Sequence, residues 1–197
     1  MADTREPETL DLVRVVRADH GCFGCGDDNP IGLHLRFAGD GDCVRASFTP
    51  SCDHQGFGNI VHGGIISTVL DEAMAWATAR AGFWAMTGDM RVRFRRPLTI
   101  GEPTVVTARV SGARGRFIST ASELMVESDG SPIATATATF VTVDADIEAA
   151  WRAQYLRESD KLMAELPDDA NPAIPVRPAR DEVSLSGGEP VASENHR

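Results

Sequence analysis

The stretch from Asn59 to Ala77 constrains the fold more than any other part of this sequence. It opens with a His-Gly-Gly turn, His62 to Gly64, and continues as a long apolar run with the helical period. Asp71 and Glu72 lie in the middle of this run, where a carboxylate is unusual unless structure or chemistry requires it. A helix start that exposes glycine amides is a ready site for negative charge. The run therefore predicts an apolar helix that sets an acid against an anion-binding terminus.

The overall composition is that of an ordinary globular protein. The 197 residues are 42% hydrophobic and 24% charged, enough for one domain with a sizeable core. The net charge of −10 argues against nucleic acid and against an anionic membrane surface as partners. The acidic start, Met1 to Glu8, lacks the features of a signal peptide, and a bilayer would penalise the two acids in the apolar run. We therefore expect a cytoplasmic protein that binds neither nucleic acid nor a membrane.

Hydrophobic periodicity predicts strands on both sides of the helix, which is expected from Gly64 to about Ala81. Side chains alternate with period two in the segments 33–37, 44–48, 90–94, 106–110, 117–127 and 133–143. Turn signals rich in Gly join several of these strands, at 39–42, 112–115 and 128–131. Clustered strands around one long helix indicate an α+β fold with an antiparallel sheet rather than alternating βαβ units.

We divide the chain into four segments. An N-terminal leader spans 1–21, the α+β domain spans 22–143, and a C-terminal helix spans 144–166, with Asp144 or Asp146 as its N-cap. Residues 167–197 are rich in proline and acids and poor in apolar side chains. Such a composition cannot bury enough surface to offset the entropy of ordering, so it predicts a disordered tail.

The central helix has two different faces. At about 100° per residue, a stripe expected to pack on the sheet contains Ile65, Ile66, Val69, Leu70, Ala73 and Ala77. The opposite side carries small residues and one acid, namely Ser67, Thr68, Asp71, Ala75 and Thr78. A solvated face would carry Lys, Glu or Arg instead, so a second copy of the chain is the simplest candidate to cover it. We expect Asp71 at a subunit boundary, and Glu72 as the partner of an arginine.

The cysteines include one C-x-x-C pair, Cys22 and Cys25. A structural zinc site takes four ligands, and the sequence has no second such pair. Other donors that the fold would have to gather are His20, Cys43, Cys52 and His54. Turn residues follow the pair, where a thioredoxin-like motif would open a helix. We therefore expect reduced cysteines in a tight loop, with no metal and no cofactor.

These features together resemble the PaaI-like branch of the hotdog-fold acyl-CoA thioesterases. The residues that carry the resemblance are the His62-Gly63-Gly64 turn, Asp71, Thr87, the strand end Arg95-Arg96-Pro97-Leu98 and the segment from Cys22 through Asn29-Pro30 to Leu33. The resemblance covers residues 22–143. It implies a hotdog fold, in which a curved antiparallel sheet wraps a long central helix, and a homodimer or homotetramer with the site between subunits.

The resemblance also implies catalytic roles. Asp71 acts as nucleophile or as general base on water, and the amide of Gly63 or Gly64 binds the thioester oxygen. Thr87 helps to hold the water. Such amide donors stabilise the negative charge that develops on a thioester carbonyl during attack.

Three residues near the turn are further candidates. Gln55 is the match for an amide side chain that lines the site in this family, with Asn59 as the competing choice. His62 could hold the turn, polarise a carbonyl or act as a base, and the sequence leaves these roles open.

Six arginines supply a local cluster of positive charge in this acidic chain, namely Arg91, Arg93, Arg95, Arg96, Arg114 and Arg116. They either steer the phosphates of CoA or form a solvated face paired with acids. We assign Arg95, Arg96, Arg114 and Arg116 to substrate binding.

The implied activity is hydrolysis of a small, aromatic or medium-chain acyl-CoA. Two other interpretations fit the same fold, because fold does not fix function. One is a non-catalytic module that binds acyl-CoA or an acyl carrier, and the other is a hydroxyacyl-thioester dehydratase that pairs His62 with Asp71 or Glu72. Metal or redox chemistry at Cys22 and Cys25 is a more distant alternative.

Overall fold

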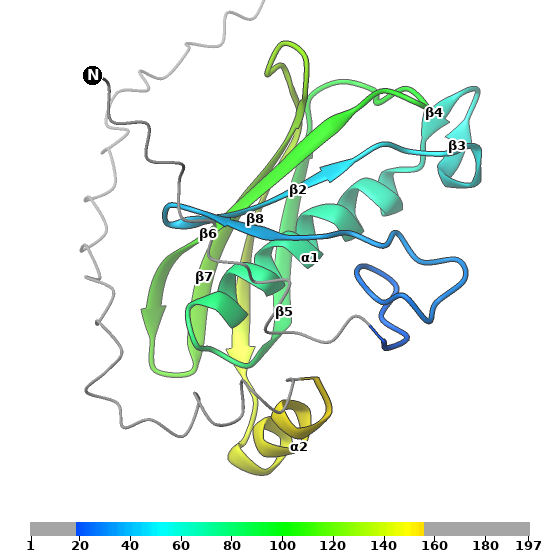
Figure 1. Cartoon of the computed structure of the whole chain (residues 1–197). Helices are drawn as coiled ribbons and strands as arrows, with labels where there is room; N and C mark the ends of the chain where they lie inside the picture. The colour runs from blue at the N-terminus through cyan, green and yellow to red at the C-terminus, as the bar shows by residue number, and fades with distance from the viewer. Residues whose placement is uncertain (1–18, 156–197) are drawn as a thin grey trace, which may run out of the picture.

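The computed structural model describes residues 19–155. Its elements follow one another in the order β1 (Ala38–Asp40), β2 (Cys43–Phe48), the 3₁₀ helix η2 (Cys52–His54), β3 (Gln55–Phe57), β4 (Ile60–Val61), α1 (Gly63–Arg80), β5 (Ala85–Phe94), β6 (Thr104–Arg114), β7 (Phe117–Val126), β8 (Pro132–Thr142) and α2 (Ala145–Tyr155) (Figure 1). The predicted α+β class, with one long helix among strands, is confirmed.

The main sheet is antiparallel and has the strand order β1-β2-β6-β7-β8-β5. Strands β3 and β4 form a separate two-stranded sheet. The main sheet curves around α1, and α2 lies beyond one end of it (Figure 1). Strand β5 is therefore an edge strand, and it holds the residues that follow the central helix.

One hydrophobic core lies between α1 and the sheet. Its fully buried members include Val69, Leu70, Met74, Leu98, Ile118, Leu124, Ile133 and Phe140. Even the polar Ser122 of β7 is buried there, where its hydroxyl donates to the carbonyl of Leu70 at 3.2 Å. This packing holds α1 rigidly on one face of the sheet.

Most of the stripe predicted to face the sheet is buried, including Ile66, Val69 and Leu70. Thr78 was expected on the other side and is buried instead, at 1% exposure. Its hydroxyl donates to the carbonyl of Ala75 at 2.7 Å, which satisfies the polar group inside the core. Ile65 is only half-buried.

The segment 33–37, predicted as a strand, is not one. Leu33, Leu35 and Phe37 are buried in alternation as expected, but the intervening His34 has a φ of 50°. This left-handed backbone interrupts an extended chain. The amides of Leu33 and Leu35 donate to carbonyls of residues 23 and 24 instead of to a sheet, and the ladder begins only at β1.

The terminal segments are only partly described. Helix α2 begins directly after Asp144, whose carbonyl accepts from the amide of Glu148 at 2.9 Å. The rest of the predicted helix 144–166, the predicted tail 167–197 and most of the leader 1–21 lie outside the described residues. No helix within residues 19–155 has the length and hydrophobicity that a membrane span requires.

Candidate active site

The start of α1 is capped by His62. The backbone of His62 is extended, with φ −62° and ψ 133°, and its Nδ1 accepts from the amide of Gly64 at 2.9 Å. The amide of Gly63, at the first helical position, has no hydrogen-bond partner within residues 19–155. Of the two amides predicted to bind a thioester oxygen, Gly64 is thus engaged by His62, and Gly63 is free.

Asp71 and Thr87 are brought together from α1 and β5. The Thr87 hydroxyl donates to Asp71 Oδ1 at 2.7 Å, the length of a strong hydrogen bond to a carboxylate. Asp71 is half-buried, and Thr87 is exposed at the sheet edge. The second carboxylate oxygen of Asp71 accepts no hydrogen bond from residues 19–155.

A β-bulge in β5 aims Thr87 at the helix. The pairing with β8 shifts between Thr87 and Asp89, so Thr87 lies opposite Phe140 and Met90 lies opposite Ala138. Both partners are buried on the helix side, so Thr87 and Met90 share that face although they are three residues apart. A Cβ at position 88 would come within 3.0 Å of Val141 and 3.2 Å of a backbone oxygen, so glycine fits the bulge. The isolated glycine in a strand pattern was a signal for this bulge that periodicity alone missed.

Gly63 and Asp71 of one chain are too far apart to act on one carbonyl. They are eight residues apart on α1, which is about 12 Å along the helix axis at 1.5 Å per residue. A water activated by Asp71 and a donor to the carbonyl oxygen must both lie about 3 Å from their targets. A complete site therefore needs a second donor from outside this stretch of the chain.

Gln55 and Asn59 lie on the hairpin before the turn. Gln55 opens β3 and pairs with Val61, and its side chain is exposed. Asn59 has a φ of 63°, a left-handed conformation that Asn tolerates better than most residues. The turn alone accounts for an asparagine at position 59, so no role in substrate binding is needed to explain it. Neither Gln55 nor Asn59 has a side-chain hydrogen bond to Asp71 within residues 19–155.

The arginines do not form the single cluster that was expected. The amide of Arg95 donates to the carbonyl of Ile133, at the start of β8, whereas the Arg116 guanidinium donates to Thr142 at its end. Nine residues of strand separate these points, or about 30 Å. Arg95 and Arg114 are exposed, and Arg116 is within 3.8 Å of Asp144.

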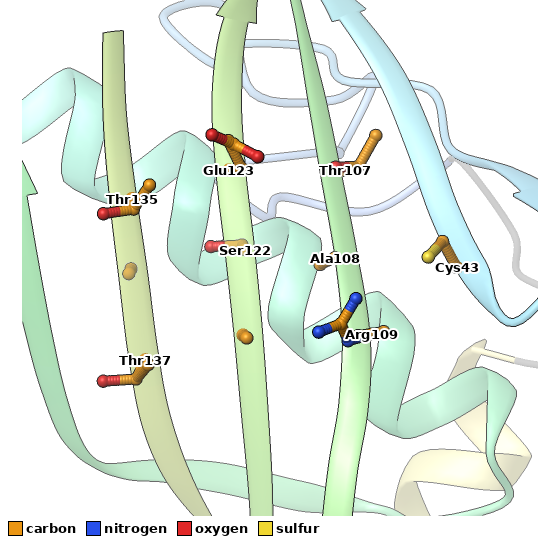
Figure 2. A pocket seen from close by; sticks show the side chains of 10 residues that line it. Cys43, Thr107, Ala108, Arg109, Ser122, Glu123, Thr135 and Thr137 are labelled. Carbon is orange, nitrogen blue, oxygen red and sulfur yellow. The ribbon is translucent and has the colours of Figure 1, made fainter. Parts of the chain in front are cut away.

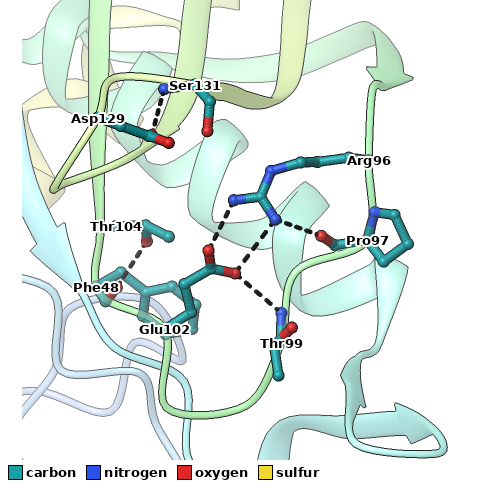
Figure 3. Close-up of polar contacts among 8 residues, drawn as sticks. All are labelled: Phe48, Arg96, Pro97, Thr99, Glu102, Thr104, Asp129 and Ser131. Atoms are coloured by element: carbon teal, nitrogen blue, oxygen red, sulfur yellow. Dashed lines mark hydrogen bonds and ion pairs between the residues drawn. The ribbon is translucent and has the colours of Figure 1, made fainter.

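Arg96 is committed to an ion pair. Its guanidinium donates to Glu102 at 2.7 Å, and Glu102 also accepts from the amide of Thr99 at 3.3 Å (Figure 3). The hydrogen bond from Arg96 lowers the pKa of Glu102. This pair closes the turn between β5 and β6, so Arg96 has a structural partner.

Glu72 faces the N-terminal loop, and within residues 19–155 it pairs with Trp76 and Cys22 rather than with the predicted arginine. Its carboxylate accepts from Trp76 Nε1 at 3.1 Å and lies 3.7 Å from the sulfur of Cys22. Burial raises the pKa of Glu72 to about 7. A hydrogen bond from Cys25 lowers the pKa of Cys22 to about 5 and raises that of Cys25. This cluster joins positions about 50 residues apart, which no local pattern could reveal.

A hollow of about 270 Å³ lies on the face of the sheet that is turned away from α1 (Figure 2). Its exposed and half-buried lining residues, such as Thr107, Arg109 and Thr137, alternate with Ala108, Ser122 and Ala136, which are buried toward the helix. The sheet therefore separates this hollow from Asp71, and it is not part of the candidate active site.

Comparison with known proteins agrees with this geometry. Residues 58–133 match the Thioesterase superfamily, and no curated protein matches the chain. The solved structure of a thioesterase superfamily protein has 29% identity and a TM-score of 0.59, covering 61% of this chain and 60% of that protein. The chain thus spans about three fifths of that relative's length.

Two more distant structures share the fold. The E. coli PaaI protein from the phenylacetic acid degradation operon has 18% identity and a TM-score of 0.53, covering 57% of this chain and 81% of that one. A hypothetical thioesterase protein from Streptococcus pneumoniae TIGR4, solved with coenzyme A, has 12% identity and a TM-score of 0.52, covering 55% of this chain and 85% of that one. The predicted resemblance and fold are confirmed to this extent: residues 58–133 match the thioesterase superfamily, and the long helix packed on an antiparallel sheet matches its hotdog-fold members.

Proposed function

We propose that this protein is an acyl-CoA thioesterase whose active site lies between two copies of the chain. Asp71 and Thr87 of one copy supply the base, and Gly63 of the other supplies the oxyanion donor. The observation that carries the proposal is the 2.7 Å hydrogen bond from Thr87 to Asp71. It holds one carboxylate oxygen and leaves the other to accept a proton.

Hydrolysis needs only these groups. Asp71 accepts a proton from water as the water oxygen attacks the thioester carbonyl carbon. The amide of Gly63 donates to the oxygen that becomes negative, and one such donor contributes about 3 kcal/mol to the transition state. The tetrahedral intermediate then expels the CoA thiolate, which takes up the proton held by Asp71. Thiolate is a good leaving group, so no separate strong acid is required.

The shape of one chain supports a second copy as the missing partner. Strand β5 is at the sheet edge, with Met86 57% and Phe94 52% exposed, and natural proteins usually cover such edges. A two-fold axis through this face makes the interface self-complementary. It sets two α1 helices antiparallel, so that Gly63 of one approaches Asp71 of the other.

Acyl-CoA is the proposed substrate class. The S. pneumoniae thioesterase that shares this fold was solved with coenzyme A, and the family resemblance points to the PaaI-like branch. The exposed Arg114, with Arg116 two residues away, is one candidate to meet the CoA phosphates, and the exposed Arg95 at the other end of the sheet is another, whereas Arg96 would have to leave Glu102. Gln55 stays a candidate for lining the site, and the acyl group is left to experiment.

The geometry does not favour a dehydratase. That reaction would pair His62 with Asp71 or Glu72. His62 Nδ1 is used to cap α1, and the Glu72 carboxylate is engaged by Trp76 and Cys22.

A panel of acyl-CoA thioesters, with release of free CoA thiol measured, tests the proposal. At least one aromatic or medium-chain member should be hydrolysed by the wild-type protein. Asp71→Asn, which keeps the size of the side chain, should lose most turnover and still fold. Binding of acyl-CoA without turnover by the wild type would instead establish a binding module, and normal turnover by Asp71→Asn would refute the mechanism.

A further inference from the structure

Three metal donors meet where the N-terminal loop crosses α1. They are the sulfurs of Cys22 and Cys25 and a carboxylate oxygen of Glu72, all within 4.8 Å of one another. Cys25 is buried, and the other two are half-buried. None of these groups belongs to the proposed catalytic site, although Glu72 directly follows Asp71 in the helix.

The loop is built closely around these donors. A Cβ at Gly24 would collide with the Glu72 carboxylate, and one at Gly26 would collide with the backbone at residues 20 and 22. Glycine at both positions therefore allows the cysteine turn to approach the helix. The amide of Gly26 donates to the carbonyl of Cys22 at 3.0 Å, which closes the turn between the two cysteines.

Further hydrogen bonds hold the turn from outside. The carbonyls of Phe23 and Gly24 accept from the amides of residues 33 and 35, at 2.8 and 2.9 Å. Arg36 donates to the carbonyl of Cys25 at 2.8 Å. The hydrogen bonds that hold the backbone of this loop therefore preorganise the donors without involving the sulfurs.

We propose that Cys22, Cys25 and Glu72 bind one zinc ion, with the fourth position open to water. Two thiolates and one carboxylate suit zinc, whereas calcium and magnesium require oxygen ligands. Binding forms two zinc–sulfur bonds and one zinc–oxygen bond, and every proton that the two sulfurs and the Glu72 carboxylate still hold passes to solvent. The ion fastens the N-terminal loop to α1 one residue away from Asp71.

This arrangement supplies the ligand that the cysteine pair lacks in the sequence. None of His20, Cys43, Cys52 or His54 joins the three-donor group; its third member is the helical Glu72. His20 is adjacent, and its Nδ1 accepts from the amide of Cys22 at 3.2 Å.

Zinc content of the purified protein tests the proposal. The full chain is produced with added zinc, purified without chelator, and analysed by elemental mass spectrometry. About one zinc ion per chain is expected. Cys25→Ser and Glu72→Gln should each lower this content at least several-fold, whereas Cys52→Ser, at an exposed cysteine outside the cluster, should retain it.

Cobalt substitution gives a second measurement that does not depend on the stability of variants. The wild-type protein, stripped of zinc and loaded with cobalt, should show the ultraviolet charge-transfer absorption of cobalt–thiolate bonds. Zinc well below stoichiometric amounts together with no cobalt–thiolate band would overturn the proposal. A Cys22–Cys25 disulfide in intact-mass analysis of the freshly purified protein would also overturn it, as would equal zinc loss in Cys52→Ser.

Discussion

At the scale of single residues, the role of each carboxylate on α1 depends on the side chains that surround it. Asp71 and Glu72 are neighbours in the sequence, yet Asp71 meets Thr87 at the sheet edge and Glu72 meets Cys22 and Trp76. The helical period separates adjacent side chains by about 100°, which explains the divergence. The sequence was sufficient to nominate Asp71 and Thr87. The contact of Glu72 with Cys22 joins residues 50 positions apart, so the sequence pattern could not predict it.

Thr87→Val removes the hydroxyl that donates to Asp71 and keeps the shape of the side chain. We expect kcat for thioester hydrolysis to fall about tenfold, because a hydrogen bond to the base is lost at a cost of about 1.4 kcal/mol. Thr87→Ser keeps the hydroxyl and should stay within a few-fold of the wild type. Equal activity of the Val and Ser variants would show that the bond has no catalytic role.

At the scale of elements, irregularities in a strand and at a helix end position the groups of the candidate site. The bulge at Gly88 turns Thr87 toward the helix, and the His62 cap leaves the Gly63 amide free. Periodicity located α1 and the long strands because their patterns extend over many residues. It failed at 33–37, where burial alternates but one left-handed residue, His34, prevents pairing.

His62→Ala removes the side-chain cap of α1. A lost N-cap costs about 1 kcal/mol, so we expect the melting temperature to fall by about 2–4 °C. His62→Asn restores a capping acceptor and should recover most of this loss. If His62→Asn also keeps turnover, His62 is a structural residue; a large fall in kcat with unchanged melting temperature would make it catalytic.

The ion pair of Arg96 and Glu102 should make stability depend on pH. The folded protein lowers the pKa of Glu102 from its usual 4.5, so the pair stabilises the fold above that pH and is lost as the pH falls through the lowered pKa. Glu102→Gln should cost at most about 1 kcal/mol at pH 7, because the pair is partly exposed. Denaturant unfolding at pH 7 and pH 3 measures the difference, which should shrink at pH 3. Glu127→Gln, at an exposed residue of the turn between β7 and β8, is the control.

At the scale of the whole molecule, the proposed active site is incomplete in one chain. Gly63 and Asp71 are about 12 Å apart on one helix, and β5 leaves one sheet edge open. The family pattern indicated that subunits share the site, but the arginines were expected to cluster because they are close in sequence. They lie at opposite ends of the sheet, since antiparallel strands carry neighbouring segments away from each other.

Gly63→Pro isolates the contribution of the amide. Proline at the first helical position removes the N–H and is well tolerated there, and the extended His62 suits a following proline. Turnover should fall about a hundredfold. Gly63→Ala keeps the N–H, and its methyl would lie 3.4 Å from Phe94, an ordinary contact, so it should stay active.

Mixed assemblies of Asp71→Asn and Gly63→Pro test the shared site most directly. Each variant alone should have lost most of its turnover. A heterodimer carrying one copy of each, isolated with two different affinity tags, should recover about half of the wild-type turnover, because one of its two sites takes both intact groups. A purified heterodimer as inactive as its parents would contradict an active site built from Asp71 of one chain and Gly63 of the other.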